Sequence, residues 1–187
     1  IRALLLRLFW IYYMHSIKTP RLLIRSLELD DISNSYVLWL NDTEVNKYME
    51  TRFQVHDYRT CKEFVTNMKD NAGEELFGIF LRANNEHIGN CKLGAINRIH
   101  HTAEISFFIG KKSCWGLGYA SEAVNYVVQY GFNFLDLVKI TAGCYEDNLG
   151  SKTVLLKSGF EIEGLLKQQV VLNGNIRTNV FKFGIIK

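Results

Sequence analysis

Apolar residues recur with two different periods along this chain of 187 residues, and each change of period marks a change from strand to helix. Short runs of branched and aromatic residues predict strands at residues 21–25, 76–81, 87–96, 103–109 and 139–145. Helical spacing predicts two short helices within residues 32–48, broken near Asn41, and further helices at 57–69, from Gly118 onward, and at 148–158. Residues 160–172 and 175–186, joined by Asn173-Gly174, are predicted to form a hairpin.

The strands between residues 76 and 109 follow one another closely and are predicted to form an antiparallel meander. The helix after Gly118 carries an apolar face, so we expect Glu122, Asn125 and Gln129 to point away from the sheet. Gly159 ends the helix of residues 148–158 where a left-handed cap is needed. The pattern therefore predicts an α/β (α+β) fold, in which a mixed sheet is flanked by helices.

Composition limits the organisation and the partners of the chain. A hydrophobic content of 48% supplies enough apolar surface for the core of one domain. A formal charge of +3 is too weak to indicate a nucleic-acid partner. The four cysteines are far apart and form no C-x-x-C pair, so we expect reduced thiols in a cytoplasmic protein and no metal site.

The first residues differ from the rest of the chain. Residues 1–13 are apolar and basic, but their apolar stretch is shorter than the roughly 20 residues that cross a bilayer. Met14 resembles a natural start. We therefore expect residues 1–13 to be added or upstream sequence, residues 14–187 to form a single domain, and the protein to have no membrane partner.

The strongest chemical signal is the glycine turn at Gly116-Leu117-Gly118, which lies between a predicted strand and a long helix. Glycines at a helix N-terminus expose backbone N–H groups to which phosphates bind, although a plain strand-to-helix turn has the same residues. No Gly-Lys-Ser/Thr follows, which excludes a P-loop. A dinucleotide-binding turn fits less well, because Ser121 replaces the third glycine and the preceding strands are predicted to be antiparallel.

Several motifs in the same order resemble the GNAT N-acetyltransferase superfamily, in the branch of the ribosomal-protein alanine and serine N-acetyltransferases. They are the segments 19–25 (TPRLLIR), 103–109 (AEISFFI), 115–123 (WGLGYASEA), Asn148-x-x-Ser151 and Gly159-Phe160. The resemblance spans residues 14–187 and implies the GNAT fold, a mostly antiparallel mixed sheet in which the strand of 103–109 splays from that of 139–145.

The resemblance implies acetyl-CoA as co-substrate, with its pantetheine arm between the splayed strands. An N–H near Phe108 or Ile109 would then stabilise the oxyanion, while the side chains of both residues belong to the core. The implied cofactor-binding residues are Phe108, Ile109, Ser113, Trp115, Gly116, Leu117, Gly118, Tyr119, Ala120, Asn148 and Ser151. Ser113 departs from the family, which usually has Arg or Gln at that position.

Two residues are candidates for catalysis. Glu104 could remove the proton of the amine, but strand geometry places it about 13 Å from the oxyanion site at roughly 3.3 Å per residue, so a water chain or an extended substrate would bridge the distance. A salt-bridged glutamate explains Glu104 equally well. The resemblance places Ser151 near the departing sulfur and Asn148 on the pantetheine, and Asn148 also suits a helix N-cap.

Acceptor selection in this superfamily comes from the first helices and the loops that face the sulfur. In this chain the corresponding residues are Trp39, Asn41, Glu50 and Arg52. This segment resembles that of acetyltransferases acting on amino sugars in nucleotide-sugar pathways. The predicted function is acetyl transfer from acetyl-CoA to a primary amine, either of an amino sugar or of a protein N-terminus, with a polyamine also open. The alternatives are a non-catalytic acetyl-CoA sensor and a dinucleotide-binding protein, and the protein is expected to be a monomer or homodimer.

Overall fold

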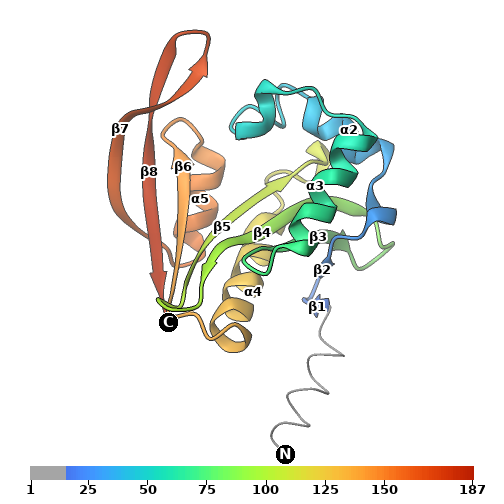
Figure 1. Cartoon of the computed structure of the whole chain (residues 1–187), viewed down its shortest axis with the longest axis horizontal. Helices are drawn as coiled ribbons and strands as arrows, with labels where there is room; N and C mark the ends of the chain where they lie inside the picture. Colours follow the sequence, from blue (N-terminus) through green and yellow to red (C-terminus); the bar gives the residue numbers. More distant parts are fainter. Residues whose placement is uncertain (1–15) are drawn as a thin grey trace, which may run out of the picture.

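Eight strands form one sheet in the computed structural model of this chain, which describes residues 16–187 (Figure 1). The prediction about residues 1–13 lies outside the described residues. The strand order is β1-β2-β3-β4-β5-β6-β8-β7. The strands are β1 (Ser16–Lys18), β2 (Leu22–Ser26), β3 (Glu75–Leu81), β4 (His87–Asn97), β5 (Thr102–Ile109), β6 (Lys139–Tyr145), β7 (Glu161–Asn173) and β8 (Ile176–Ile186).

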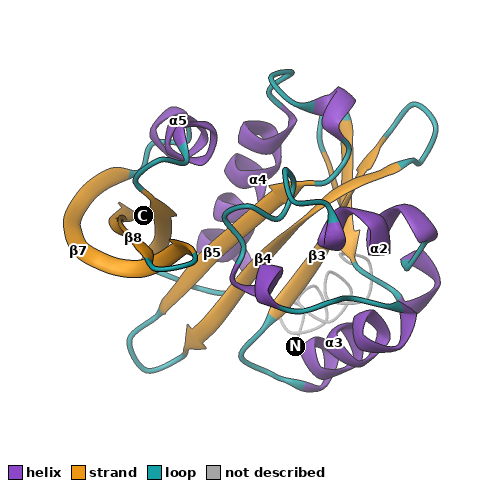
Figure 2. Ribbon diagram, turned by 90° about the horizontal axis from the view of Figure 1, so that it is seen from above, coloured by secondary structure: helices purple, strands orange, loops and turns teal. Residues whose placement is uncertain are grey.

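Within the described residues, four α-helices lie on the two faces of this sheet. Their bounds are α2 (Asn34–Asn41), α3 (Tyr58–Asp70), α4 (Tyr119–Phe134) and α5 (Leu149–Lys157). Short 3₁₀ helices occupy η1 (Leu29–Asp31), η2 (Glu50–Phe53) and η3 (Lys112–Cys114). Figure 2 shows α2 and α3 on one side of the sheet and α4 and α5 on the other.

Strand pairing confirms the mixed, mostly antiparallel sheet. The β3–β4–β5 meander is antiparallel, as predicted, and so are the β6–β8 and β7–β8 pairs. Among residues 16–187, only β5 and β6 pair in parallel, and the chain passes from one to the other through α4. A dinucleotide-binding fold requires a parallel sheet from its first strand-helix-strand unit, so this topology argues against that alternative.

Two hydrophobic clusters hold the layers together. The larger lies beneath α4 and α5 and includes the fully buried Val124, Val127 and Ile140. The smaller lies beneath α2 and α3, where Tyr36 and Val65 pack on Phe80 of β3. Because both clusters share the sheet, burial on its two faces fixes the position of every strand that leads into the candidate site.

Local signals place most helix ends correctly. The Asp57 carboxylate accepts a hydrogen bond from the Thr60 N–H at 2.7 Å and caps α3. Gly159 has φ +85°, as its predicted role of left-handed cap requires. The predicted second helix after Asn41 is wrong, because residues 42–49 form turns that the Asp42 side chain stabilises by accepting from the Glu44 N–H at 2.9 Å.

Candidate active site

The glycine turn between β5 and α4 is open to solvent and has the backbone conformation that anion binding needs. Gly116 and Gly118 have φ angles of +73° and +81°, which residues other than glycine rarely adopt. Gly118 is the N-cap of α4 and offers no side chain to the free N–H groups of the first turn. A Cβ on Gly116 would meet no atom within 4 Å, so a ligand can approach the backbone there. These residues fit the phosphates of coenzyme A.

Side chains of residues just before this turn anchor it to β5 and to the loop after α2. The indole N–H of Trp115 donates to the carbonyl of Ile109, the last residue of β5, at 2.7 Å. The ammonium group of Lys112 lies 2.8 Å from the Asp42 carboxylate and 2.6 Å from that of Glu44. Ser113, where the family usually has a longer side chain, lies exposed in η3.

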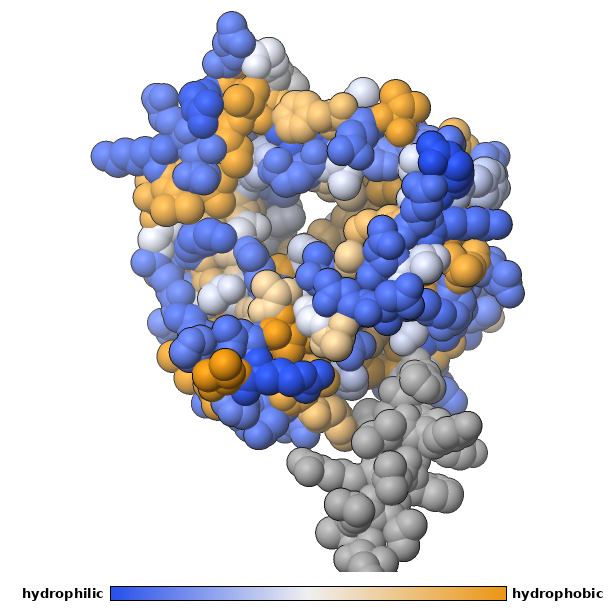
Figure 3. All heavy atoms as spheres, viewed as in Figure 1, coloured by the Kyte–Doolittle hydropathy of each residue, from blue (hydrophilic) through white to orange (hydrophobic). Residues whose placement is uncertain are grey.

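Beside the turn, β5 and β6 separate. They pair only through Thr102 with Lys139, Ala103 with Ile140, and Glu104 with Thr141. Beyond these pairs the two strands diverge, which confirms the predicted splay (Figure 1). Figure 3 shows a hollow between the part of the surface over β7 and β8 and the part over α2 and α3. The separated edges leave backbone groups free to pair with an extended ligand.

The N–H of Ile109 points into this gap. A Cβ on Gly89 of β4 would lie 2.2 Å from the carbonyl oxygen of Phe108, so this oxygen rests directly against Gly89. All described peptide bonds are trans, and the two ends of a trans peptide point in opposite directions. The N–H of Ile109, which shares that peptide with the Phe108 carbonyl, therefore faces away from β4. The side chains of Phe108 and Ile109 pack against the hydrophobic clusters.

Asn148 and Ser151 lie where β6 passes into α5, at the other edge of the gap. The Asn148 side chain caps α5 by accepting from the Ser151 N–H at 3.1 Å. Both residues are half-buried. Among residues 16–187, the Ser151 hydroxyl has no hydrogen-bond partner, so it is free to bind a ligand atom.

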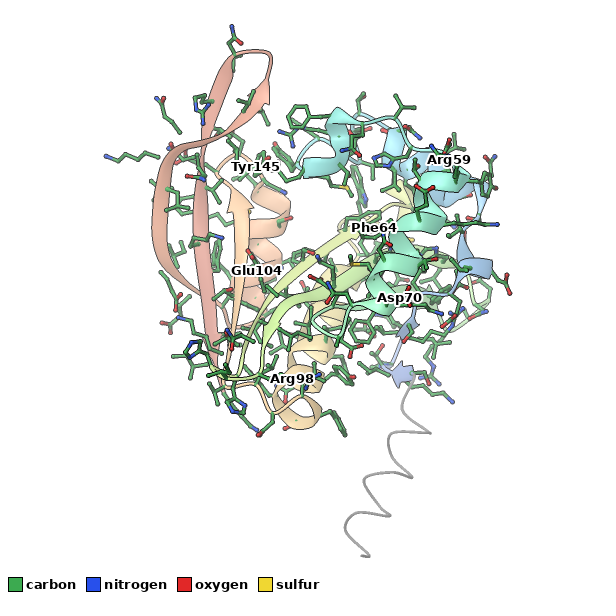
Figure 4. The ribbon with its side chains drawn as sticks, viewed as in Figure 1. Arg59, Phe64, Asp70, Arg98, Glu104 and Tyr145 are labelled. Atoms are coloured by element: carbon green, nitrogen blue, oxygen red, sulfur yellow. The ribbon has the colours of Figure 1, made fainter. Side chains whose placement is uncertain are left out.

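Glu104 lies at the closed end of the gap. Its carboxylate is 47% exposed and lies 3.3 Å from the ammonium group of Lys182 on β8. Figure 4 shows Glu104 and Tyr145 at different levels of the gap, with Tyr145 near the far end of β6. This geometry matches the salt-bridged alternative and leaves direct contact with an amine at Ile109 out of reach, so any role as a base depends on intervening water.

A second cluster lies at the far end of β6, which we call the Tyr145 cluster and define as Glu50, Arg52 and Tyr145. The Tyr145 hydroxyl donates to the Glu50 carboxylate and accepts from the Arg52 guanidinium at 3.0 Å. Burial and the bond to Glu50 raise the pKa of Tyr145. Arg52 also donates to the Met49 carbonyl at 2.7 Å and to the Val171 carbonyl of β7.

The other two predicted acceptor residues have evident packing roles. The half-buried Trp39 ring lies against Gly110, where a Cβ would come within 2.1 Å of it, directly after β5. Asn41 donates to the His56 carbonyl at 2.8 Å and accepts from the His56 N–H at 2.9 Å. Trp39, Glu50 and Arg52 thus contact the elements that border the gap, while Asn41 joins two neighbouring loops.

The sequence prediction missed Tyr145, Arg21 and Glu122. Glu122 was expected to point away from the sheet, but its partners were not predicted: its carboxylate accepts from the Arg21 N–H at 3.0 Å and from the Thr19 hydroxyl. Burial acts to raise the pKa of Glu122, but these bonds outweigh it and lower that pKa. The acidic residue in the first turn of α4 and the arginine in 19–25 were visible signals, but no local pattern brings them together.

Among residues 16–187 there is no group of three His, Cys, Asp or Glu residues placed to hold a metal ion. Cys61, Cys91, Cys114 and Cys144 are free thiols, and all four are buried. Burial raises the pKa of Cys144 to about 11, which keeps this thiol protonated near neutral pH. Within the same part of the chain, no helix has the length and apolar character to span a membrane.

The sequence matches the family described as acetyltransferase (GNAT) domain over residues 21–161. The uncharacterized N-acetyltransferase p20 of Bacillus licheniformis is 32% identical over 176 residues, which cover 93% of this chain and 97% of the relative. A crystal structure of a GNAT-family acetyltransferase from Bacillus anthracis is 29% identical, with a TM-score of 0.77 over 91% of this chain and 98% of that one.

Two relatives from Escherichia coli carry named substrates. The spermidine N(1)-acetyltransferase of strain K12 is 25% identical over 89% of this chain and 84% of its own length. The ribosomal-protein-serine acetyltransferase is 32% identical over 99 residues, which cover 53% of this chain and 54% of the relative. The matches confirm the predicted resemblance to the ribosomal-protein acetyltransferases, and they add a polyamine acetyltransferase to the relatives.

Proposed function

We propose that this chain, which belongs to the GNAT family of acetyl-CoA-dependent N-acetyltransferases, transfers the acetyl group directly to a primary amine at the gap between β5 and β6. The gap is the observation that supports this reaction best, because the phosphate-binding turn lies at one side of it and the free Ser151 hydroxyl at the other. A ligand that spans both has phosphates at one end and a reactive group at the other.

The residues at the gap can perform direct transfer. Acetyl-CoA supplies an activated thioester, and the Ile109 N–H is placed to donate to the thioester oxygen as it gains negative charge. The Ser151 hydroxyl can donate to the sulfur as the carbon–sulfur bond breaks. The ammonium form of the acceptor first gives one proton to water. The neutral nitrogen then attacks the thioester carbon, the carbon–sulfur bond breaks to release the coenzyme A thiolate, and the nitrogen loses a second proton to water or, through water, to Glu104. No protein nucleophile is needed, which agrees with the buried and protonated Cys144 thiol.

The Tyr145 cluster supports an amine acceptor. The exposed residue Glu50 begins η2, and its carboxylate accepts from Tyr145 at the far end of β6. A carboxylate attracts the positive charge of a protonated amine. We propose that Glu50 binds the ammonium form of the acceptor and that Tyr145 and Arg52 hold Glu50 in place. The amino sugar and the protein N-terminus predicted from the sequence both carry such a group, and so does a polyamine.

Acceptor screening tests this function. Purified protein with acetyl-CoA is offered a nucleotide-linked amino sugar, a peptide with a free N-terminus, and spermidine, and released coenzyme A is measured as free thiol. At least one amine is expected to give turnover that an acetylated copy of the same amine does not. If acetyl-CoA raises the melting temperature but no amine releases thiol, the chain acts as a binding sensor and the proposed transfer is wrong.

A further inference from the structure

Arg21, the residue before β2, lies against the phosphate-binding turn although it is about 100 residues away in sequence. Its Nη1 donates to the carbonyl of Leu117, between the two glycines, at 2.8 Å. Its Nε lies 2.6 Å from a Glu122 carboxylate oxygen. Its guanidinium carbon lies 4.5 Å from the centre of the Tyr119 ring. One side chain therefore contacts the turn and the first turn of α4 at once.

Glu122 fixes this arginine from the protein side. The Glu122 side chain is only 12% exposed, whereas that of Arg21 is 46% exposed, so the carboxylate lies beneath the guanidinium. The carboxylate also accepts from the Thr19 hydroxyl and the Arg21 backbone N–H. The third nitrogen of the guanidinium, Nη2, lies 3.4 Å from the point where a Cβ on Gly118 would stand.

We propose that Arg21 is a positioning residue for phosphate binding: it holds the Leu117 carbonyl so that the N–H groups of the glycine turn face the ligand. It also places a positive charge beside Gly118, at a turn where Ser113 contributes none. A guanidinium suits this role because its donors form a planar fork that can bind a carboxylate and a carbonyl together. The inference rests on coenzyme A binding and not on the identity of the amine.

Arg25 provides a matched control. It lies on β2, four residues after Arg21, and pairs with both oxygens of Asp31 at 2.6 and 2.7 Å. Its guanidinium carbon lies 4.0 Å from the centre of the Phe80 ring. The two arginines thus have the same kinds of contacts, one acidic and one aromatic. Only Arg21 contacts the glycine turn.

The test measures coenzyme A binding by calorimetry, which needs no acceptor. Arg21→Ala is expected to weaken coenzyme A binding about 10- to 100-fold, the effect of losing a hydrogen bond to a charged group. Arg25→Ala is expected to leave it within about twofold, while thermal melts report the stability of both variants. Pantetheine, which lacks the phosphates, is expected to bind the wild type and Arg21→Ala equally. Equal coenzyme A affinities for the two arginine variants would overturn the proposal.

Glu122→Gln separates positioning from charge. Removing a negative charge near an anion site strengthens anion binding if charge alone matters. Positioning predicts the opposite, because Arg21 loses its anchor and coenzyme A binding weakens. Arg21→Lys keeps the charge but cannot bridge Glu122 and Leu117, so it is expected to recover only part of the affinity. If Arg21→Lys binds coenzyme A as tightly as the wild type, or if Glu122→Gln binds it more tightly, the positioning role is contradicted. Absence of turnover with every amine would contradict only the proposed function.

Discussion

The two sides of the gap are built in different ways. On the cofactor side, β5, the glycine turn and α4 follow one another within residues 102–134, and the free groups are those of the backbone at the start of α4. On the acceptor side, side chains from separate segments meet. Tyr145 lies 95 residues from Glu50, and Val171 lies 119 residues from Arg52. The acceptor side can therefore change by substitution of side chains while the cofactor side keeps its geometry, which fits relatives that acetylate different amines.

The largest expected effect comes from moving the backbone of the cofactor side. Gly89→Ala places a Cβ 2.2 Å from the Phe108 carbonyl and forces the peptide that carries the Ile109 N–H to move. Loss of an oxyanion donor lowers kcat about 100- to 1,000-fold. Steady-state kinetics with the best acceptor measures this. Gly164→Ala is the control, since its Cβ meets no atom within 4 Å, and an equal fall in both variants would argue against the Ile109 N–H.

A smaller effect is expected at the edge of α5. Ser151→Ala removes the hydroxyl proposed to bind the sulfur and is expected to lower kcat about 10- to 100-fold, as for a hydrogen bond to a charged group, with little change in acetyl-CoA affinity. Kinetics and calorimetry together measure the two effects. Thr153→Ala, two residues further on, removes a hydroxyl bonded to the Leu149 carbonyl and is expected to have normal kcat. Equal losses of turnover and affinity in Ser151→Ala would contradict the assignment.

A substitution on the acceptor side is expected to change the KM for the amine and to leave the KM for acetyl-CoA unchanged. Tyr145→Phe removes the hydroxyl that joins Glu50 to Arg52, so the KM for the amine is expected to rise about tenfold while that for acetyl-CoA stays the same. Tyr126→Phe, on the exposed surface of α4, is the control. A parallel rise in both KM values would show that the two sides are not independent.

The smallest expected effect concerns stability and pH. The pKa of Glu122 is lowered in the folded protein, so its contribution is complete above its ordinary pKa of 4.5 and is lost as the pH falls through the folded value. The free energy of unfolding of the wild type should exceed that of Glu122→Gln by about 1 kcal/mol at pH 7. This difference should shrink below pH 4.5. Urea unfolding from pH 7 to pH 3 measures it. A difference that stays constant over this range would argue against an ionised Glu122.

Local patterns predicted most elements of the fold and the glycine turn. Period-2 alternation identified β6, period-3.6 spacing identified α4, and the Asn173-Gly174 turn identified the β7–β8 hairpin. The glycine turn was found because its conformation depends on residues within it. The resemblance added what periodicity lacks, the splay of β5 from β6.

The resemblance named Glu50 and Arg52, but the sequence could not predict how the acceptor side is assembled around Tyr145, because distant contacts decide it. Residues 42–49 have helical spacing, but Lys112 pairs with Asp42 and Glu44, and Asn46 donates to the Leu40 carbonyl, so turns form instead. The alternating pattern of β6 predicts on which face of the sheet Tyr145 lies. It does not predict that η2 packs against that residue. The ion pair of Glu122 with Arg21 was missed for the same reason, because it depends on where β2 packs in the fold.

The contact between Arg21 and Glu122 has a consequence for how the protein folds. The two residues are 101 positions apart, and closing so long a loop costs chain entropy that local structure does not repay. Contacts of this kind slow folding, so α4 and its glycine turn can form before the amino-terminal strand docks on them. The contacts of Arg21 with this turn would then be among the last to form, and full affinity for coenzyme A would report that folding is complete.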